Sequence, residues 1–222
     1  MNKDKIRAAY KESKNIYDDV LTHKGLLSKI YINFFWGVDD LVIAEKILSW
    51  IPDDFSGQLL DVPVGTGVFT HKKYQKIENA KIVGLDYSDD MLEKAEIRFK
   101  DIKNIELIQG DVGSLQFEDN SFDIVLSMNG FHVFPDKKMA FSEVFRVLKP
   151  DGKFIGCFYI QKEKLLTDIV VNMVLKRKGW FSSDQLTKDE VITVLNKQYK
   201  KVRVENKNAM IWFNCENKNL TR

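Results

Sequence analysis

The sequence has 222 residues, of which 44% are hydrophobic and 30% are charged, a composition typical of one soluble globular domain. Its N-terminus, MNKDKIRAAYKESKN, is polar and unlike a secretory signal. The longest apolar run, near residues 169–175, is too short to span a bilayer. We therefore expect a cytoplasmic protein with no membrane partner. Cys157 and Cys215 are expected to be free, because disulfides are rare in that compartment.

The charge of the chain is distributed unevenly, although the net charge is only +2. Residues 151–222 carry +6 and residues 1–150 carry −4. A basic C-terminal part can attract an anionic partner such as RNA, or it can be a solvated lysine-rich surface. No aromatic residues alternate with the basic ones to stack on bases, so a nucleic-acid partner is not expected. No Cys or His pair has the spacing of metal ligands, so no metal is expected.

The N-terminal residues 1–37 have an amphipathic helical pattern that ends in an aromatic cluster. The cluster comprises Tyr31, Phe34, Phe35 and Trp36. Two interpretations are open: a helical cap over an apolar ligand, or aromatic residues that complete the core. Tyr31 and Trp36 are candidate substrate contacts if the cap interpretation holds.

Residues 59–70, LLDVPVGTGVFT, combine a buried strand, a turn containing Gly65 and Gly67, and the start of a helix. This order opens many nucleotide-binding βαβ units. The next two strands each end in an acid, at Asp86 and Asp111. Asp86 lies about 20 residues beyond the glycine turn, an offset at which such folds place a carboxylate on ribose. Polar groups at successive strand ends predict one ligand-binding edge.

The alternation of strands and helices predicts a Rossmann-like, doubly wound α/β fold with a mostly parallel seven-stranded sheet. The predicted strands are 59–62, 81–86, 105–111, 122–127, 153–159, 201–205 and 209–215. The helices expected around them are 41–50, one ending near 76, 91–99, one beginning at 135–136, 162–178 and 187–199. The last two strands are close enough for a hairpin, so the final strand should be antiparallel.

We expect a single domain, in which the N-terminal cap covers residues 1–37 and an inserted helical segment covers residues 160–186. The chain shows no internal repeat and no low-complexity linker that would divide it. The apolar residues of the insertion and the aromatic cap together suggest a closed pocket for a small, partly apolar molecule.

Over residues 40–216 the chain resembles the class I S-adenosylmethionine-dependent methyltransferases, and the quinone-biosynthesis C-methyltransferase group in particular. The resemblance rests on DVPVGTG at 61–67, on the acid Asp86, on Gly110-Asp111, and on LKPDG at 148–152. Pro63 departs from the family, which usually has its first turn glycine there; proline fixes φ and offers no N–H. Asp151 replaces a glycine of the last motif, and Asp tolerates turn conformations.

The resemblance implies that the protein binds S-adenosylmethionine. Asp61 would hold the methionine amino group, Asp86 would accept from both ribose hydroxyls, and Asp111 would accept from the adenine amino group. Residues 127–130, after the fourth strand, would lie under the methionyl end and face the methyl group. The full set of residues implied for the cofactor is Asp61, Gly65, Gly67, Asp86, Tyr87, Met91, Asp111, Val112 and Ser127.

Methyl transfer needs alignment and exclusion of water more than covalent catalysis. If the acceptor must lose a proton, His132 is the candidate base, because it follows the fourth strand and an unperturbed histidine has a pKa near 6.5. A purely structural histidine is the alternative.

Two other function classes compete with a methyltransferase. An NAD-type oxidoreductase or epimerase would need a third glycine where the chain has Thr70, and it is absent. A non-catalytic S-adenosylmethionine-binding protein stays open, because methyl transfer has no signature catalytic residue. The methyltransferase interpretation ranks first.

Overall fold

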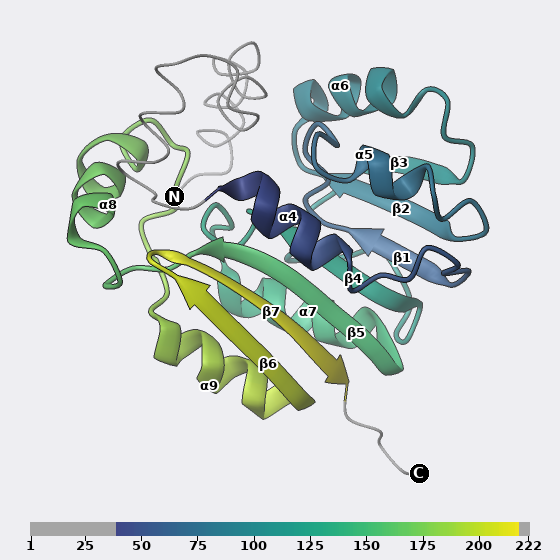
Figure 1. Cartoon of the computed structure of the whole chain (residues 1–222). Helices are drawn as coiled ribbons and strands as arrows, with labels where there is room; N and C mark the ends of the chain where they lie inside the picture. The colour runs from purple at the N-terminus through teal and green to yellow at the C-terminus, as the bar shows by residue number, and fades with distance from the viewer. Residues whose placement is uncertain (1–38, 218–222) are drawn as a thin grey trace.

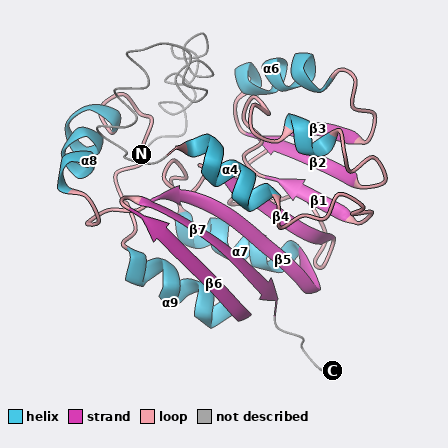
Figure 2. Ribbon diagram, in the orientation of Figure 1, coloured by secondary structure: helices cyan, strands magenta, loops and turns pink. Residues whose placement is uncertain are grey.

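The computed structural model describes residues 39–217, which form a seven-stranded sheet with helices on both faces (Figures 1 and 2). The strand order is β3-β2-β1-β4-β5-β7-β6. The pairs among β1 to β5 are parallel, whereas β7 is antiparallel to β5 and to β6. The doubly wound sheet and its antiparallel last strand, both predicted from the sequence, are confirmed.

Six of the seven strands lie within two residues of their predicted bounds, whereas β5 begins five residues earlier than predicted and includes the residues expected to form the bend before it. The strands are β1 Gln58–Asp61, β2 Lys81–Asp86, β3 Ile105–Gln109, β4 Phe122–Met128, β5 Leu148–Tyr159, β6 Tyr199–Lys207 and β7 Met210–Asn217. The helices are α4 Asp40–Leu48, α5 His71–Tyr74, α6 Asp89–Phe99, α7 Lys137–Val147, α8 Leu165–Val170, the π-helix η2 Val171–Leu175, and α9 Lys188–Gln198.

Three helices begin where a side chain accepts from a backbone N–H that the helix itself leaves unpaired. Asp39 caps α4 by accepting from the N–H of Leu41, and Asp136 caps α7 by accepting from that of Met139. At α9, Thr187 and Glu190 form a reciprocal capping box. The helix starts are therefore set by short polar motifs.

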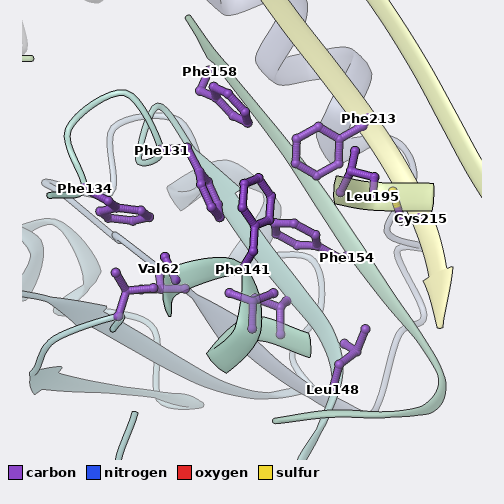
Figure 3. Close-up of a cluster of buried hydrophobic side chains, with 14 of the residues drawn as sticks. Val62, Phe131, Phe134, Phe141, Leu148, Phe154, Phe158, Leu195, Phe213 and Cys215 are labelled. Carbon is purple, nitrogen blue, oxygen red and sulfur yellow. The ribbon is translucent and has the colours of Figure 1, made fainter. Parts of the chain in front are cut away.

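The two faces of the sheet bury different side chains, as the alternation of a strand requires. One face packs under α4, α5 and α6, around residues such as Leu59, Ile82 and Ile155. The opposite face packs against α7 and α9, and it is dominated by phenylalanines, labelled in Figure 3 with Val62, Leu148, Leu195 and Cys215. Both cysteines are buried and free, as predicted.

Two predicted helices differ from the structure. The helix after the glycine turn is a single turn, α5, preceded by turns at residues 68–70. Gly67 has φ +71°, which lies outside the α-helical region, so the helix cannot extend back through this residue. The helix predicted at 162–178 begins only at Leu165, and its second half is the π-helix η2. The predicted N-terminal cap, with Tyr31 and Trp36, lies outside the described residues.

A third, smaller cluster attaches α8 and η2 to the body of the protein. Val171 and Leu175 are buried there with Tyr159, at the end of β5, and with Phe181. Because β5 is parallel to β4, its last residue lies at the same edge of the sheet as the last residue of β4. The inserted segment is therefore packed at the carboxyl edge of the sheet.

Candidate functional site

A pocket of about 970 Å³, including its open mouth, lies at the carboxyl ends of β1, β2, β3 and β4. Open parallel sheets bind ligands at this edge. Its lining comes from four places: the turn after β1, the end of β2 with the start of α6, the residues after β3, and the loop after β4. The lining residues are 61–70, Leu85, Asp86, Tyr87, Met91, Gly110, Asp111, Val112, Met128, Asn129, Val133, Phe134 and Pro135.

The turn after β1 takes a conformation that requires glycine. Gly65 and Gly67 have φ of +56° and +71°. A Cβ at position 67 would lie 2.2 Å from the ring of Phe99, whereas one at position 65 would meet no protein atom within 4 Å. The peptide bond between Val62 and Pro63 is cis. The turn thus keeps both of its positive-φ glycines in the presence of Pro63.

Asp86 fastens this turn to the second strand. One of its carboxylate oxygens accepts from the N–H of Gly65 and the other from the N–H of Ser88, both at 2.9 Å. Burial raises the pKa of Asp86 to about 6, and the hydrogen bonds from Ser88 and Gly65 act in the opposite direction. Asp86 lines the pocket, and a carboxylate has about four acceptor positions, so acceptor capacity remains beyond its hydrogen bonds from Gly65, Ser88 and Tyr87.

Asp61 ends β1 and is 1% exposed, which raises its pKa to about 7. The hydroxyl of Tyr74, from α5, donates to its Oδ2 at 2.7 Å and lowers that pKa, while the charge of Asp86 raises it further. Tyr74 is itself fully buried and packs on Phe99. The carboxylate is therefore held at a fixed position at the pocket wall.

The third side of the pocket combines an acid with apolar surface. Asp111 accepts from the N–H of Gly113 at 2.9 Å, which fixes the turn after β3. Val112 and Met91 are buried beside it, and Tyr87 is partly exposed. Eight of the nine residues predicted for the cofactor line the same pocket.

Ser127 is the ninth, and the structure places it outside the lining. It is fully buried in β4, and its Oγ has no hydrogen-bond partner among the described residues. Its neighbours Met128 and Asn129 line the pocket instead. Asn129 has φ +56°, and its Oδ1 is buried without a partner in the described part of the chain. Asn129 belongs to the segment 127–130 that the resemblance placed under the methionyl end, so the segment was expected there although the contributing residue differs from Ser127.

His132 does not line the pocket. Its ring stacks on Phe181 with the centroids 4.2 Å apart, and its carbonyl accepts from the N–H of Ser182. Burial lowers its pKa to about 3, and the charge of Lys137 acts in the same direction. A histidine so enclosed is a weak base, so this geometry favours the structural alternative; the catalytic role stays a prediction.

The segment of the chain that contains the pocket-lining residues is similar to known proteins. A family model described as "Methyltransferase domain" matches residues 59–152. The demethylmenaquinone methyltransferase of Staphylococcus carnosus is 40% identical over 149 residues, which are 67% of this chain and 60% of that protein. Its counterpart in Lactococcus lactis is 40% identical over 106 residues, 46% of this chain and 42% of that one. The chain thus spans about half the length of these curated relatives.

Residues 59–152 thus match the methyltransferase-domain family, and the relatives and the fold are those of S-adenosylmethionine-dependent methyltransferases. Solved structures share the fold at low sequence identity. An S-adenosylmethionine-dependent methyltransferase of Thermotoga maritima has a TM-score of 0.69 at 17% identity, over 96% of this chain and 99% of that one. Phosphoethanolamine N-methyltransferase 2 of Haemonchus contortus, solved with S-adenosylmethionine, has a TM-score of 0.67 at 18% identity, over 80% of this chain and 52% of that one.

The pocket fits the cofactor of the methyltransferase-domain family by its chemistry. S-adenosylmethionine carries ribose hydroxyls, an ammonium group and an adenine amino group, all of which donate hydrogen bonds. The pocket offers three carboxylates as acceptors, and apolar surface from Leu85, Met91 and Val112 for a flat base. Within residues 39–217, no three His, Cys, Asp or Glu side chains are grouped to hold a metal. No helix in that range is long and apolar enough to cross a membrane.

Proposed function

We propose that this chain transfers the methyl group of S-adenosylmethionine to a small-molecule acceptor by in-line displacement. The observation that carries the proposal is the convergence of Asp61, Asp86 and Asp111, from three adjacent strand ends, on one pocket. When bound, S-adenosylmethionine supplies a methyl group attached to a good leaving group, the sulfonium sulfur. The protein then has to bind, align and shield the reactants.

The acids are proposed to hold the cofactor at three points. Asp86 accepts from the ribose hydroxyls with the acceptor capacity that its backbone hydrogen bonds leave open. Asp61 takes the methionine amino group, since an ammonium favours the ionised form of a carboxyl whose pKa burial raises to about 7. Asp111 and the N–H of Val112 bind the adenine, between Tyr87 and Met91.

The loop after β4 is proposed to face the acceptor. Met128, Val133 and Phe134 give this wall an apolar surface that excludes water, and Asn129 adds one buried acceptor oxygen without a partner among the described residues. Alignment in such a site can contribute roughly 7–11 kcal/mol in the best intramolecular cases. No proton-transfer step is assigned to His132 in this proposal, because it does not line the pocket.

The acceptor is proposed to be small and partly apolar. The apolar wall supports this, and so does the similarity to proteins named demethylmenaquinone methyltransferases. A cytoplasmic location belongs to the same proposal and is supported by the two free, buried cysteines.

Two measurements test the proposal. Calorimetry should show binding of S-adenosylhomocysteine and little binding of NAD; preference for NAD would overturn it. Incubation with methyl-labelled cofactor and fractionated metabolite extracts should then label a small molecule. Tight cofactor binding with no labelled product in any extract would instead support the non-catalytic alternative.

A further inference from the structure

The outer side of α8 and η2 exposes large apolar side chains to solvent. Five such residues lie there, half of all large hydrophobic side chains exposed within residues 39–217. We call this surface the α8–η2 apolar face; it comprises Leu165, Leu166, Ile169, Met173 and Val174. Leu165 is 75% exposed and Met173 is 59% exposed. Contiguous apolar surface on a helix usually marks a contact site.

The inner side of the same helix is firmly attached to the body of the protein. Val171 and Leu175 are buried against Tyr159 and Phe181. Asp168 accepts from the hydroxyl of Tyr159 at 2.5 Å and from the N–H of Lys162 at 2.9 Å. The outer side chains therefore cannot turn inward without breaking these contacts. A helix that is apolar on both sides is normally covered on both sides.

Basic side chains flank the α8–η2 apolar face at both ends. Lys162 and Lys164 precede it, and Lys176, Arg177 and Lys178 follow it. The only acids between residues 162 and 178 are Glu163 and Asp168. Both accept hydrogen bonds, Glu163 from Asn206 and Asp168 from Tyr159. The segment thus combines exposed apolar side chains with a net charge of +3, and the charge complement of such a segment is anionic.

From this arrangement we propose that the α8–η2 apolar face docks on the surface of an anionic lipid bilayer. Helices that lie in a membrane interface present apolar side chains to the acyl region and basic ones to anionic headgroups. A membrane contact of this kind is peripheral and needs no spanning helix. It would revise the expectation, drawn from hydropathy alone, that the protein has no membrane partner.

The position of the face gives the docking a functional consequence. β5 ends at Tyr159, at the edge of the sheet that also carries the pocket, and α8 follows six residues later. Docking would therefore hold this edge close to the lipid, where apolar acceptors are concentrated. Only this consequence rests on the proposed function; the docking itself does not.

The test is sedimentation of the full chain with vesicles. Vesicles of phosphatidylglycerol and phosphatidylcholine in equal amounts should bind the protein, and vesicles of phosphatidylcholine alone should bind it at least tenfold less. The double variant Leu165→Gln/Met173→Gln should bind the anionic vesicles about tenfold more weakly than the wild type. Ile97→Gln is the matched control, because Ile97 lies on α6 and is 73% exposed; it should bind like the wild type.

The basic residues are tested by Lys162→Gln/Arg177→Gln. Each basic charge near an anionic surface contributes about fivefold in binding, so this variant should bind roughly 25-fold more weakly at low salt, with a smaller salt dependence. All of these variants should keep their affinity for S-adenosylhomocysteine. That measurement separates a failure of the docking proposal from a failure of the proposed function.

Three outcomes would overturn the proposal. The first is a wild-type chain that ignores anionic vesicles, or a double variant that still binds them fully. The second is a dimer in analytical ultracentrifugation that Leu165→Gln/Met173→Gln dissociates, since a second copy would then cover the face. The third is a double variant that melts at a clearly lower temperature while neither protein binds vesicles, which would mean that another part of this chain covers the face.

Discussion

The aromatic core between the sheet and α7 stabilises the fold, whereas the carboxyl edge around the pocket contains features that destabilise it. The core buries Phe131, Phe141, Phe154, Phe158 and Phe213, each at most 2% exposed and packed ring against ring (Figure 3). It contains no strained backbone and no charge that needs a partner. Its contribution is stability, through the burial of apolar surface.

The pocket edge collects features that oppose folding. Asn129 has a positive φ, which is uncommon for a residue other than glycine, and Asp61 and Asp86 are carboxyls that burial makes harder to ionise. A ligand with hydrogen-bond donors would relieve the cost of the acids, but the ligand-free protein has to bear it. The burial of apolar surface in the core therefore offsets the unfavourable free energy of forming the pocket edge. Five predictions test this contrast.

The largest effect is expected in the core. Phe154→Ala removes a fully buried ring from the centre of the cluster and should lower the free energy of unfolding by about 3–5 kcal/mol, measured in urea. The folded fraction should bind S-adenosylhomocysteine within about twofold of the wild type. A stable variant with lost affinity would mean that the core also shapes the pocket.

The two glycines of the turn form a matched pair. Gly67→Ala has to accommodate both φ of +71° and a Cβ 2.2 Å from Phe99, so it should cost about 2–4 kcal/mol of stability. Gly65→Ala has φ of +56° but free space around its Cβ, so about 1–2 kcal/mol is expected. Thermal unfolding of both variants measures the difference. Equal losses would show that the contact with Phe99 is easily relieved.

Asp86→Ala should affect binding more than folding. Two charge-assisted hydrogen bonds to ribose, each worth about 1.5–3 kcal/mol, are proposed there, so the dissociation constant for S-adenosylhomocysteine should rise at least tenfold. Glu93→Ala, an exposed acid on α6, is the control and should change nothing. An unchanged dissociation constant for Asp86→Ala would show that this strand end does not hold the ribose.

The smallest effect concerns pH. Asp61 and Asp86 have folded pKa values of about 7 and about 6, above the unfolded value of 3.8. Protonation of these two carboxyls therefore stabilises the folded, ligand-free protein fully below about pH 4, and this stabilisation is lost as the pH rises to about 7. The affinity for the ligand should change with pH in the opposite direction. If binding requires both Asp61 and Asp86 to be ionised, the affinity should fall at least about tenfold from pH 7.5 to 5.5.

The variant Tyr74→Phe tests whether Asp61 is the group responsible for this pH dependence of affinity. The variant loses the hydrogen bond that lowers the pKa of Asp61, so its pKa should rise and the pH at which affinity falls should move upward. At pH 7 the affinity should drop about threefold to tenfold, the usual range for one hydrogen bond, and at pH 9 much of the loss should be recovered. A midpoint that stays in place would show that Tyr74 does not control Asp61.

The sequence by itself determined the order of the elements and the position of the binding edge. Strand and helix periodicities, glycines in the turn after β1, and acids at strand ends are local signals, and the structure places Asp61, Asp86 and Asp111 in one pocket as the spacing indicated. The closing hairpin was equally local, because the gap between β6 and β7 is too short for a crossover.

The tertiary structure, by contrast, sets which side chains reach the pocket and what their pKa values and hydrogen-bond partners are. Ser127 and Asn129 are two residues apart, yet one is buried in the sheet and the other lines the pocket. The ring of His132 packs on Phe181, and the pKa of Asp61 is raised by burial and lowered by the hydroxyl of Tyr74. Burial, pKa and hydrogen-bond partners are set by segments that meet only when the chain is folded, so no local pattern contains them.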